Sequence, residues 1–176
     1  MRAMIMVEVA KCVGCRGCQL ACAVAHSKSQ TLLGAVAEGS KPRVSVLSSG
    51  DLAIPLQCRQ CEDAPCVAIC PTGALTKPQE NGLVATDDTK CIGCRACMLV
   101  CPFGVISVGG KGRAIVKCDL CVSRLDAGET PACVGSCKTG AMQYGDLEEM
   151  VAERRQRTAE ETRQAESARS RLQSAQ

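Results

Sequence analysis

The chain has 176 residues, a formal net charge of +3 at pH 7 and 16 cysteines, but only one tyrosine, one phenylalanine and no tryptophan. This length fits one compact domain or two small ones, and so few aromatic side chains exclude an ordinary, large hydrophobic core. The small net charge, with no basic patch among aromatic residues, excludes a nucleic-acid-binding protein, and the lack of a long apolar stretch excludes direct membrane insertion.

The first predicted element is a half-buried strand at residues 4–9, where β-branched residues alternate with others. Glu8 interrupts this apolar run and no arginine pair lies near the start, so we predict no export signal and a cytoplasmic location. Structural disulfides are rare in that reducing compartment, and metal binding is the commoner use of cysteine there. A disulfide framework, which the even cysteine count would allow, is therefore the weaker interpretation.

Four cysteine groups follow along the chain, and the repeat they form is the strongest signal in the sequence. Each group opens with C-x2-C and closes with C-x3-C, and only the middle gap varies. The members are Cys12, Cys15, Cys18 and Cys22 in group one; Cys58, Cys61, Cys66 and Cys70 in group two; Cys91, Cys94, Cys97 and Cys101 in group three; and Cys118, Cys121, Cys133 and Cys137 in group four.

The flanks of the groups repeat as well. Strand-like runs lead into them at residues 4–9, 52–57, 82–87 and 113–117. Gly73, Gly104 and Gly140 each stand three residues after a fourth cysteine, where a tight turn would need positive φ before another strand. The predicted unit is therefore strand, cysteine loop, short helix ending at the fourth cysteine, turn and strand.

Three segments lie outside this repeat. Residues 26–52 are a connector in which we expect a strand at 43–47, and GGKG at 109–112 is too short for a phosphate loop and predicts a hairpin turn. Residues 146–176 have no glycine or proline and carry many charges at helical spacing, so we expect a separate, charged C-terminal helix or tail. Asp146 is its expected N-cap, the helix should cover 147–157, and order beyond 157 is expected only against a partner.

The stretch CIGCRACMLVCP at 91–102 has the spacing of bacterial two-cluster ferredoxins, C-x2-C-x2-C-x3-C-P. A short loop with three thiolates, each separated by two residues, can bind three corners of one [4Fe–4S] cube. The fourth thiolate then projects toward a neighbouring cube. Sixteen cysteines divide into four such cubes with none left over. Zinc also binds paired C-x2-C groups, but it explains neither the third cysteine nor the C-x3-C-P ending.

Six basic residues stand beside the cysteines: Lys11, Arg16, Arg59, Lys90, Arg95 and Lys117. Because each oxidised cubane with four thiolates carries a charge of about −2, four of them would bring the whole protein to about −5. The six cations could offset that charge, or they could be ordinary solvated surface residues.

The chain resembles the four-cluster [4Fe–4S] electron-transfer subunits of oxidoreductase complexes, the family of the iron–sulfur subunits of dimethyl sulfoxide reductase and formate dehydrogenase. The resemblance rests on CVGCRGCQLAC, CRQCEDAPCVAICPTGAL, CIGCRACMLVCPFGVI and KCDLCVSRLDAGETPACVGSCKTGAM, within residues 4–145. It is strongest to small members that serve carbon monoxide dehydrogenase, hydrogenase or tungsten aldehyde oxidoreductase. It implies an α+β fold, a duplicated ferredoxin-like unit over 1–145 with approximate twofold symmetry, followed by the helix or tail at 146–176.

The resemblance also implies that groups one and four exchange their fourth cysteines, and that groups two and three do the same. The implied ligands are Cys12, Cys15, Cys18 and Cys137 for cluster 1; Cys118, Cys121, Cys133 and Cys22 for cluster 2; Cys58, Cys61, Cys66 and Cys101 for cluster 3; and Cys91, Cys94, Cys97 and Cys70 for cluster 4. Four cubes in a row would conduct single electrons.

We therefore expect a non-catalytic electron-transfer subunit. Its partners would be the catalytic subunit of an oxidoreductase, such as a molybdenum or tungsten aldehyde oxidoreductase or formate dehydrogenase, carbon monoxide dehydrogenase or hydrogenase, and a second electron carrier or flavin subunit. Copies could also join end to end. A free polyferredoxin and a zinc-bound scaffold are the alternatives. His26 is expected to be a hydrogen-bonded structural residue, and Tyr144 and Phe103 to pack against clusters.

Overall fold

The computed structural model describes residues 3–79, 82–109 and 114–174. The chain divides into two units, one covering residues 4–144 and the other made of Ala3 and the residues from Gly145 onward. All 16 cysteines lie in the first unit, so this unit positions the candidate site. The predicted hairpin turn at 109–112 lies outside the described residues from position 110 onward.

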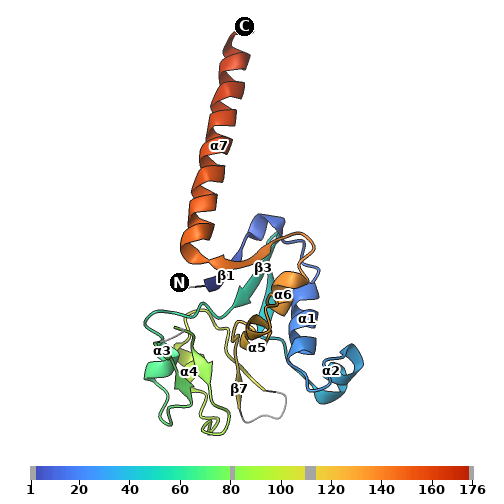
Figure 1. Ribbon diagram of the computed structural model, residues 1–176, viewed down its shortest axis with the longest axis vertical. Coiled ribbons are helices and arrows are strands. Elements are labelled where there is room, and N and C mark those ends of the chain that lie inside the picture. The colour runs from blue at the N-terminus through green and yellow to red at the C-terminus, as the bar shows by residue number, and fades with distance from the viewer. Residues whose placement is uncertain (1–2, 80–81, 110–113, 175–176) are drawn as a thin grey trace. The chain divides into compact units, whose positions relative to one another are not determined.

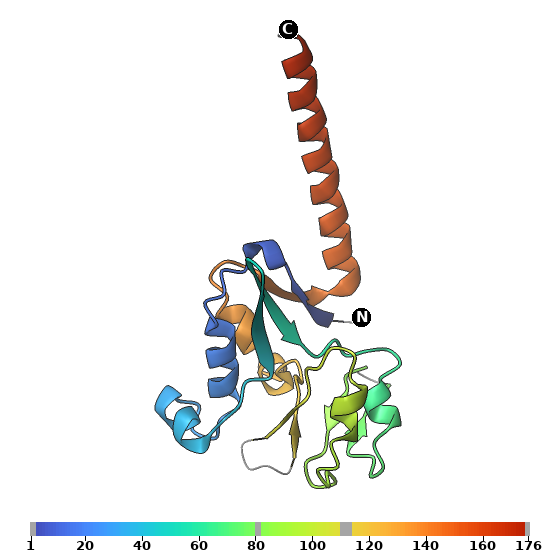
Figure 2. The ribbon, with the colours of Figure 1, turned by 180° about the vertical axis from the view of Figure 1, so that it is seen from behind.

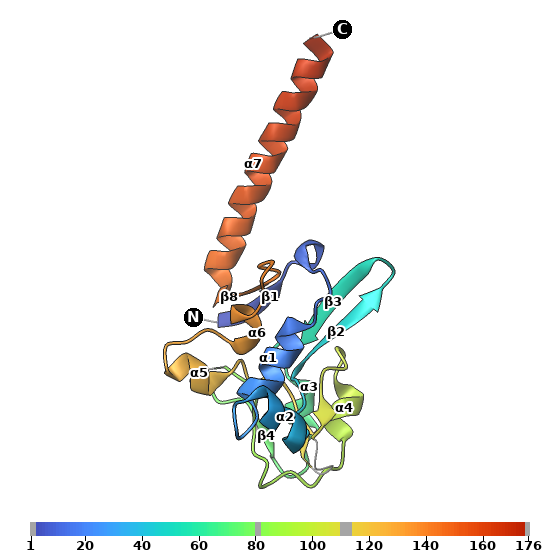
Figure 3. The same ribbon diagram turned by 90° about the vertical axis from the view of Figure 1, so that its right-hand side faces the viewer.

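Within the described ranges the strands form four small two-stranded sheets (Figure 1). These sheets pair β1 (Ala3–Val7) with β8 (Met142–Asp146), β2 (Val44–Ser49) with β3 (Leu52–Gln57), β4 (Leu75–Thr76) with β5 (Ala85–Thr86), and β6 (Ser107–Val108) with β7 (Ile115–Val116). The longest is the antiparallel β2–β3 hairpin, which turns at Gly50 (Figure 3). Val44 and Val46 are buried and alternate with exposed Ser45 and Leu47, so one face of this hairpin packs inward.

Each cysteine group leads into a short helix that carries its third cysteine. These helices are α1 (Gly17–Ala25), α3 (Pro65–Ala68), α4 (Ala96–Val100) and α6 (Ala132–Gly135), which carry Cys18, Cys66, Cys97 and Cys133 in that order. α3, α4 and α6 end within two residues of the fourth cysteine, as predicted, whereas α1 continues past Cys22 to Ala25. The 3-10 helix η1 (Val9–Lys11) precedes group one, and α5 (Val122–Asp126) lies inside the long gap of group four.

The connector contains one helix that the sequence did not predict, α2 (Leu32–Glu38). Thr31 caps it, because its Oγ1 accepts a hydrogen bond of 3.2 Å from the backbone N–H of Gly34. The strand expected at 43–47 is present as β2.

The three predicted glycine turns are confirmed, with φ of 62° at Gly73, 59° at Gly104 and 65° at Gly140. Residues with a Cβ avoid this left-handed region, so glycine lets the chain reverse directly after the fourth cysteine.

Two hydrophobic cores organise the first unit, and cysteine is a main component of both. The first core buries Ile5, Cys18, Cys22, Val44, Val46, Cys118, Leu120, Cys133 and Met142, and Cys58, Cys137 and Tyr144 pack against it. The second core buries Cys66, Leu75, Val84, Cys97, Ile106 and Ile115, and Cys70, Cys91 and Cys101 pack against it. Around the first core α1 contacts α6 and β2, and beside the second α3 contacts α4 (Figure 2). The expected α+β, ferredoxin-like arrangement of short helices and small strands is confirmed.

The second unit is dominated by α7 (Leu147–Ser174). Asp146 caps it as predicted, because its Oδ1 accepts hydrogen bonds from the backbone N–H groups of Glu148 at 2.9 Å and Glu149 at 3.4 Å. The expectation that the helix covers only 147–157 is wrong, since it continues unbroken to Ser174. Residues 152–171 are exposed and rich in alanine, glutamate, glutamine and arginine, which favour a helix without any tertiary contact. Among the described residues no helix combines the length and apolar character that crossing a membrane requires.

Candidate metal centre

All four cysteine loops share one backbone feature that the spacing alone does not reveal. The residue just before the second cysteine is left-handed in every group, with φ of 71° at Gly14, 49° at Gln60, 74° at Gly93 and 59° at Leu120. Left-handed residues in such turns bring successive backbone N–H groups to one concave side, a nest that attracts anions and occurs at iron–sulfur sites. Each loop is therefore preshaped to surround a sulfide-rich, negatively charged group.

The structure brings Cys22 of group one to the thiols of group four. Burial raises the pKa of Cys22 to about 11, and the negative charge of Cys121 adds to that rise. Burial also raises the pKa of Cys118 to about 12, with Cys22 contributing, and it raises the pKa of Cys133, with Cys118 and Cys22 contributing. Cys22 is thus an electrostatic neighbour of all three, although a chain of more than 90 residues separates it from them.

Groups two and three approach each other in the same way. Burial raises the pKa of Cys66. The charges of Cys58, in its own group, and of Cys101, in group three, raise it further. Cys70 of group two lines one pocket together with Cys91, Cys94 and Cys97 of group three. This pocket contains about 330 Å³ of space between atoms, part of it open to solvent.

Group one supplies three thiols that lie near one another. Burial raises the pKa of Cys18 most, and the charges of Cys12 and Cys15 raise it further. Cys137, the fourth cysteine implied for this set, packs against the first core, which also contains Cys18. All 16 cysteines are free thiols in the structure, so the disulfide framework that the even count would allow is not formed.

Several groups around the sulfurs, which the sequence analysis missed, donate or share hydrogen bonds with them. The backbone N–H of Arg43 lies 3.2 Å from Cys22 Sγ, and that of Leu120 lies 3.4 Å from Cys118 Sγ. Thr72 Oγ1 lies 3.8 Å from Cys70 Sγ, and Thr139 Oγ1 lies 3.7 Å from Cys137 Sγ. Hydrogen bonds to sulfur tune cluster potentials, and a threonine two residues after the fourth cysteine of groups two and four is the sequence signal that could have found this pair.

Cys70 and Cys137 differ from the buried thiols in their proton affinity. Burial works against ionisation of Cys70, but backbone N–H groups, those of Leu75 and Thr72 foremost, outweigh it and lower its pKa. The pKa of Cys137 is lowered in the same way, against burial, by the N–H of Met142 and the hydroxyl of Thr139. Both fourth cysteines therefore meet a ring of donors at the glycine turn that follows them.

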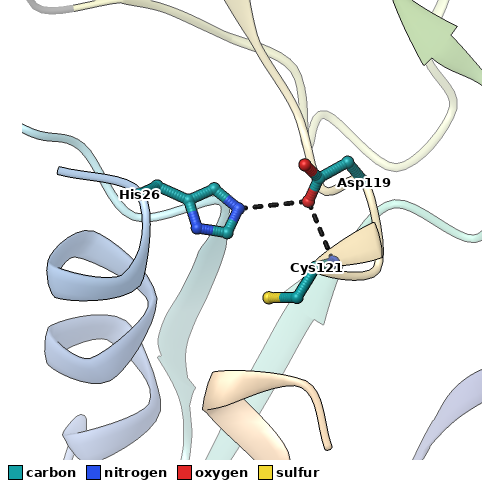
Figure 4. Close-up of side chains that lie close together, drawn as sticks. All are labelled: His26, Asp119 and Cys121. Carbon is teal, nitrogen blue, oxygen red and sulfur yellow. Dashed lines mark hydrogen bonds and ion pairs between the residues drawn. The ribbon is translucent and has the colours of Figure 1, made fainter. Parts of the chain in front are cut away.

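His26 belongs to a polar cluster at the edge of group four (Figure 4). Its Nε2 lies 3.1 Å from Asp119 Oδ1, and the same oxygen accepts a hydrogen bond of 3.0 Å from the backbone N–H of Cys121. Arg43 forms an ion pair with the other carboxylate oxygen. Burial lowers the pKa of His26, and the charge of Arg43 lowers it further. His26, Asp119 and Cys121 lie close enough together to suggest a metal site. However, the Asp119 carboxylate already binds His26, Arg43 and the backbone N–H of Cys121. The predicted hydrogen bonding of His26 is confirmed at Nε2, and its structural role stays a prediction.

Asp119 links the group-four loop to the connector, because its carboxylate binds the backbone N–H of Cys121 as well as Arg43 and His26; this arrangement is called the Asp119 clamp. Burial opposes its ionisation, but the guanidinium of Arg43 and the N–H of Cys121 outweigh it and lower the pKa of Asp119. Of the two aromatic residues, Tyr144 packs against the first core and Phe103 is 42 % exposed. That either residue packs against a cluster stays a prediction.

The donor set fits iron–sulfur clusters. Each cysteine group offers four thiols, each loop has a left-handed residue before its second cysteine, and the most buried thiols have raised pKa values. Such thiols stay protonated in the free chain and would lose their protons when they bind a metal, so metal binding and folding of these cores are coupled.

Comparison with known proteins agrees with this chemistry. Residues 51–147 match the 4Fe–4S dicluster domain family. The electron transport protein HydN of Escherichia coli (strain K12) is 37 % identical, over 90 % of this chain and 98 % of HydN. An iron–sulfur protein of Rhodospirillum rubrum is 44 % identical over 78 % of each chain, and the thiosulfate reductase electron transfer subunit PhsB of Salmonella typhi is 37 % identical over 82 % of this chain and 76 % of PhsB.

These matches span nearly the whole cysteine-bearing unit and favour [4Fe–4S] clusters over zinc. The chain therefore belongs to the 4Fe–4S dicluster family of iron–sulfur proteins, and its role is electron transfer.

Proposed function

We propose that this chain is a non-catalytic subunit that relays single electrons through four [4Fe–4S] clusters inside an oxidoreductase complex. In this proposal four ligand sets hold the clusters. Set 1 is Cys12, Cys15, Cys18 and Cys137; set 2 is Cys118, Cys121, Cys133 and Cys22; set 3 is Cys58, Cys61, Cys66 and Cys101; and set 4 is Cys91, Cys94, Cys97 and Cys70.

The observation that carries the proposal is that consecutive sets are neighbours through named thiols. Cys18 of set 1 lies in the first core with Cys118 and Cys133 of set 2. Cys58 of set 3 packs against that core, and Cys66 of set 3 lies in the second core with Cys97 of set 4. Among the described residues, neither core combines cysteines of set 1 with cysteines of set 4. This pattern supports a row in the order 1, 2, 3, 4.

The two ends of that row carry the exposed cysteines. Cys15 in set 1 and Cys94 in set 4 are the exposed members of the sixteen. Val13 and Ile92, which precede them by two residues, are 71 % and 56 % exposed. These features support electron uptake at one outer set and release at the other, because an electron carrier must bring its cluster close to the partner's redox group.

The partner in this proposal is the catalytic subunit of an oxidoreductase. The name of PhsB assigns it to a thiosulfate reductase, which supports a partner of that general kind. A formate dehydrogenase, an aldehyde oxidoreductase, carbon monoxide dehydrogenase and hydrogenase are the candidate partners, with a second carrier or flavin subunit at the other end. A reducing, cytoplasmic location is part of the proposal because 16 free thiols persist there.

The test is anaerobic purification of the tagged chain from its own cells, followed by addition of possible electron donors. We expect a larger polypeptide to co-elute in gel filtration. Formate, an aldehyde, carbon monoxide or hydrogen, added one at a time, should then bleach the visible absorption of the clusters in this complex. If none of the four does, cluster reoxidation by thiosulfate after chemical reduction is tested.

A variant with Val13→Glu and Ile92→Glu tests whether electrons pass through the two exposed ends. It alters both ends and leaves every cysteine in place. It should keep its iron and lose the fast bleaching. A brown monomer without any co-eluting polypeptide would instead establish a freely diffusing polyferredoxin and contradict the subunit role.

A further inference from the structure

The internal repeat places a lysine immediately before the first cysteine in three of the four groups. These residues are Lys11, Lys90 and Lys117, whereas group two has Gln57 at this position. The side chain of Lys11 is 44 % exposed and pairs with Glu8 at 2.9 Å, and that of Lys90 is 60 % exposed and pairs with Asp87 at 3.2 Å. Lys117 is only 3 % exposed. Equivalent sequence positions therefore have two very different environments.

Lys117 lies where the two cores meet. Its Nζ donates hydrogen bonds to the carbonyl oxygen of Val84, a residue of the second core, and to that of Cys118, a residue of the first, the latter at 3.0 Å. Gln60 repeats the connection, because its Nε2 donates to Cys118 O at 3.0 Å and its Oε1 accepts from Val84 N–H at 2.8 Å. Gln60 is 4 % exposed, so two buried polar side chains join the same two backbone positions.

Lys117 also differs from Lys11 and Lys90 in its charge balance. Among the described residues, Lys117 is the one buried residue with a charged side chain. No carboxylate of the described residues forms an ion pair with it, and its hydrogen-bond partners are backbone carbonyl oxygens. A buried ammonium is costly unless a negative group or several hydrogen bonds compensate it. Its two carbonyl acceptors supply part of that compensation.

The remaining compensation would come from clusters in the proposed sets on either side. Val84, whose carbonyl oxygen accepts a hydrogen bond from Lys117, lies in the second core together with Cys66. Cys66 belongs to proposed set 3, and Cys118, next to Lys117 in the chain, belongs to proposed set 2. Cys58 of set 3 in turn packs against the first core beside set 2. Lys117 is therefore placed between the two middle sets of the row.

We propose that Lys117 is a positioning residue whose buried positive charge, fixed by its hydrogen bonds and by Gln60, raises the reduction potentials of the two middle clusters. This inference rests on the proposed function, since it needs clusters in sets 2 and 3. Reduction adds one electron and thus one negative charge to a cluster, so a nearby cation favours the reduced state. Lys11 and Lys90 act much less, because solvent and their carboxylate partners screen them.

The experiment compares Lys117→Met, which removes the charge, with Lys117→Arg, which keeps it, and with the matched control Lys90→Met. Each protein is purified anaerobically, its iron and sulfide are measured, and its clusters are titrated electrochemically with electron paramagnetic resonance as the readout. In Lys117→Met at least one middle cluster should become harder to reduce. At a fixed potential its ratio of reduced to oxidised cluster should fall about tenfold, which is a lowering of the reduction potential by about 59 mV for one electron. Lys117→Arg should retain most of the wild-type potential, and Lys90→Met should leave all potentials in place.

Unchanged potentials in a fully loaded Lys117→Met protein would overturn the inference while leaving the electron-transfer role intact. If Lys117→Met loses clusters, the arginine variant decides: full loading of Lys117→Arg supports the need for a charge, and loss of clusters there too assigns Lys117 a steric role and overturns the inference. Gln60→Glu gives a second route, because it keeps an acceptor for Val84 N–H and adds a negative charge at the same place. A loaded Gln60→Glu protein must show the same downward shift.

Discussion

The two cores use the same cysteine loop but conceal their thiols to different degrees. In the first core Cys18, Cys22, Cys118 and Cys133 are all buried. The second core buries Cys66 and Cys97, while Cys70, Cys91 and Cys101 pack at its margin and remain partly accessible.

The segments outside the repeat explain this difference. The connector contributes Val44 and Val46 to the first core, and the long gap of group four contributes Leu125 from α5. The second core is built with the two-residue strands β4 to β7, and among the described residues no longer strand or connector helix packs against it. Because burial and hydrogen bonding set cluster potentials, the repeat determines which thiols can act as ligands, and the segments between the repeats determine how each cluster behaves.

Removal of iron is the largest perturbation of both cores. Four of the nine buried residues in the first core and two of the six in the second are cysteines, so we expect the apo form to lose the structure of residues 4–144. Amide hydrogen exchange of the chelator-treated, reduced protein should show loss of protection across this range. With limiting chelator the second core should lose protection first, because it buries two cysteines whereas the first core buries four. Full protection in the iron-free protein would refute the coupling of metal to folding.

Replacing a crossing ligand in each core should remove one cluster of four. Cys22→Ser is expected to damage the cluster held with Cys118, Cys121 and Cys133, and Cys101→Ser the cluster held with Cys58, Cys61 and Cys66. Each variant should lose about a quarter of its iron, together with one set of paramagnetic signals. Signals that instead vanish from the cluster of the residue's own group would show that the exchange of fourth cysteines is wrong.

The Asp119 clamp offers a smaller, local test of the difference between the cores. Asp119→Ala removes the partner of Arg43, of His26 and of the Cys121 N–H, and should cost about 2 kcal/mol. For comparison, Asp87 lies four residues before the first cysteine of group three, and its carboxylate holds Thr89 and Lys90 at the surface. Asp87→Ala should therefore lower the anaerobic thermal midpoint much less. If Asp119→Ala and Asp87→Ala lowered the thermal midpoint equally, burial of the carboxylate would not explain how much it contributes to stability.

The glycine turns should respond alike in both cores, with the smallest effect. Gly140 leads into β8 beside the first core, and Gly73 leads into β4 beside the second. Apart from the glycine and its chain neighbours, no described heavy atom lies within 4 Å of a Cβ built at either position, so alanine meets only the strain of positive φ. Gly140→Ala and Gly73→Ala should each cost about 1 kcal/mol in thermal or denaturant unfolding of the loaded protein. A markedly larger loss at one site would reveal a constraint that the backbone does not explain.

The sequence predicted features that depend on neighbouring residues. Gly73, Gly104 and Gly140 have the positive φ that their position after a cysteine required, and Asp146 caps the helix that follows it. The spacing of the cysteines led to the cofactor and the family, because a cluster demands several thiols from a short loop.

Long-range contacts were beyond the reach of the pattern. His26 and Asp119 lie 93 residues apart in the chain, and Gln60 and Cys118 lie 58 residues apart. Lys117 was one of six cations grouped together for their charge, and nothing near it in sequence distinguishes it from Lys90. Leu120 takes a left-handed conformation that its side chain disfavours, and its burial in the first core stabilises that conformation. Burial depends on which segments fold over a residue, and periodicity does not encode it.

The most direct test of the central claim is quantitative electron paramagnetic resonance on the anaerobically purified, fully reduced protein, together with iron and sulfide analysis. A row of four neighbouring clusters predicts about 16 iron atoms per chain and about four spins, with the broadening that magnetic coupling between close clusters produces. An iron-free preparation, or isolated and uncoupled signals from fewer clusters, would contradict an electron path that runs through all four cysteine groups.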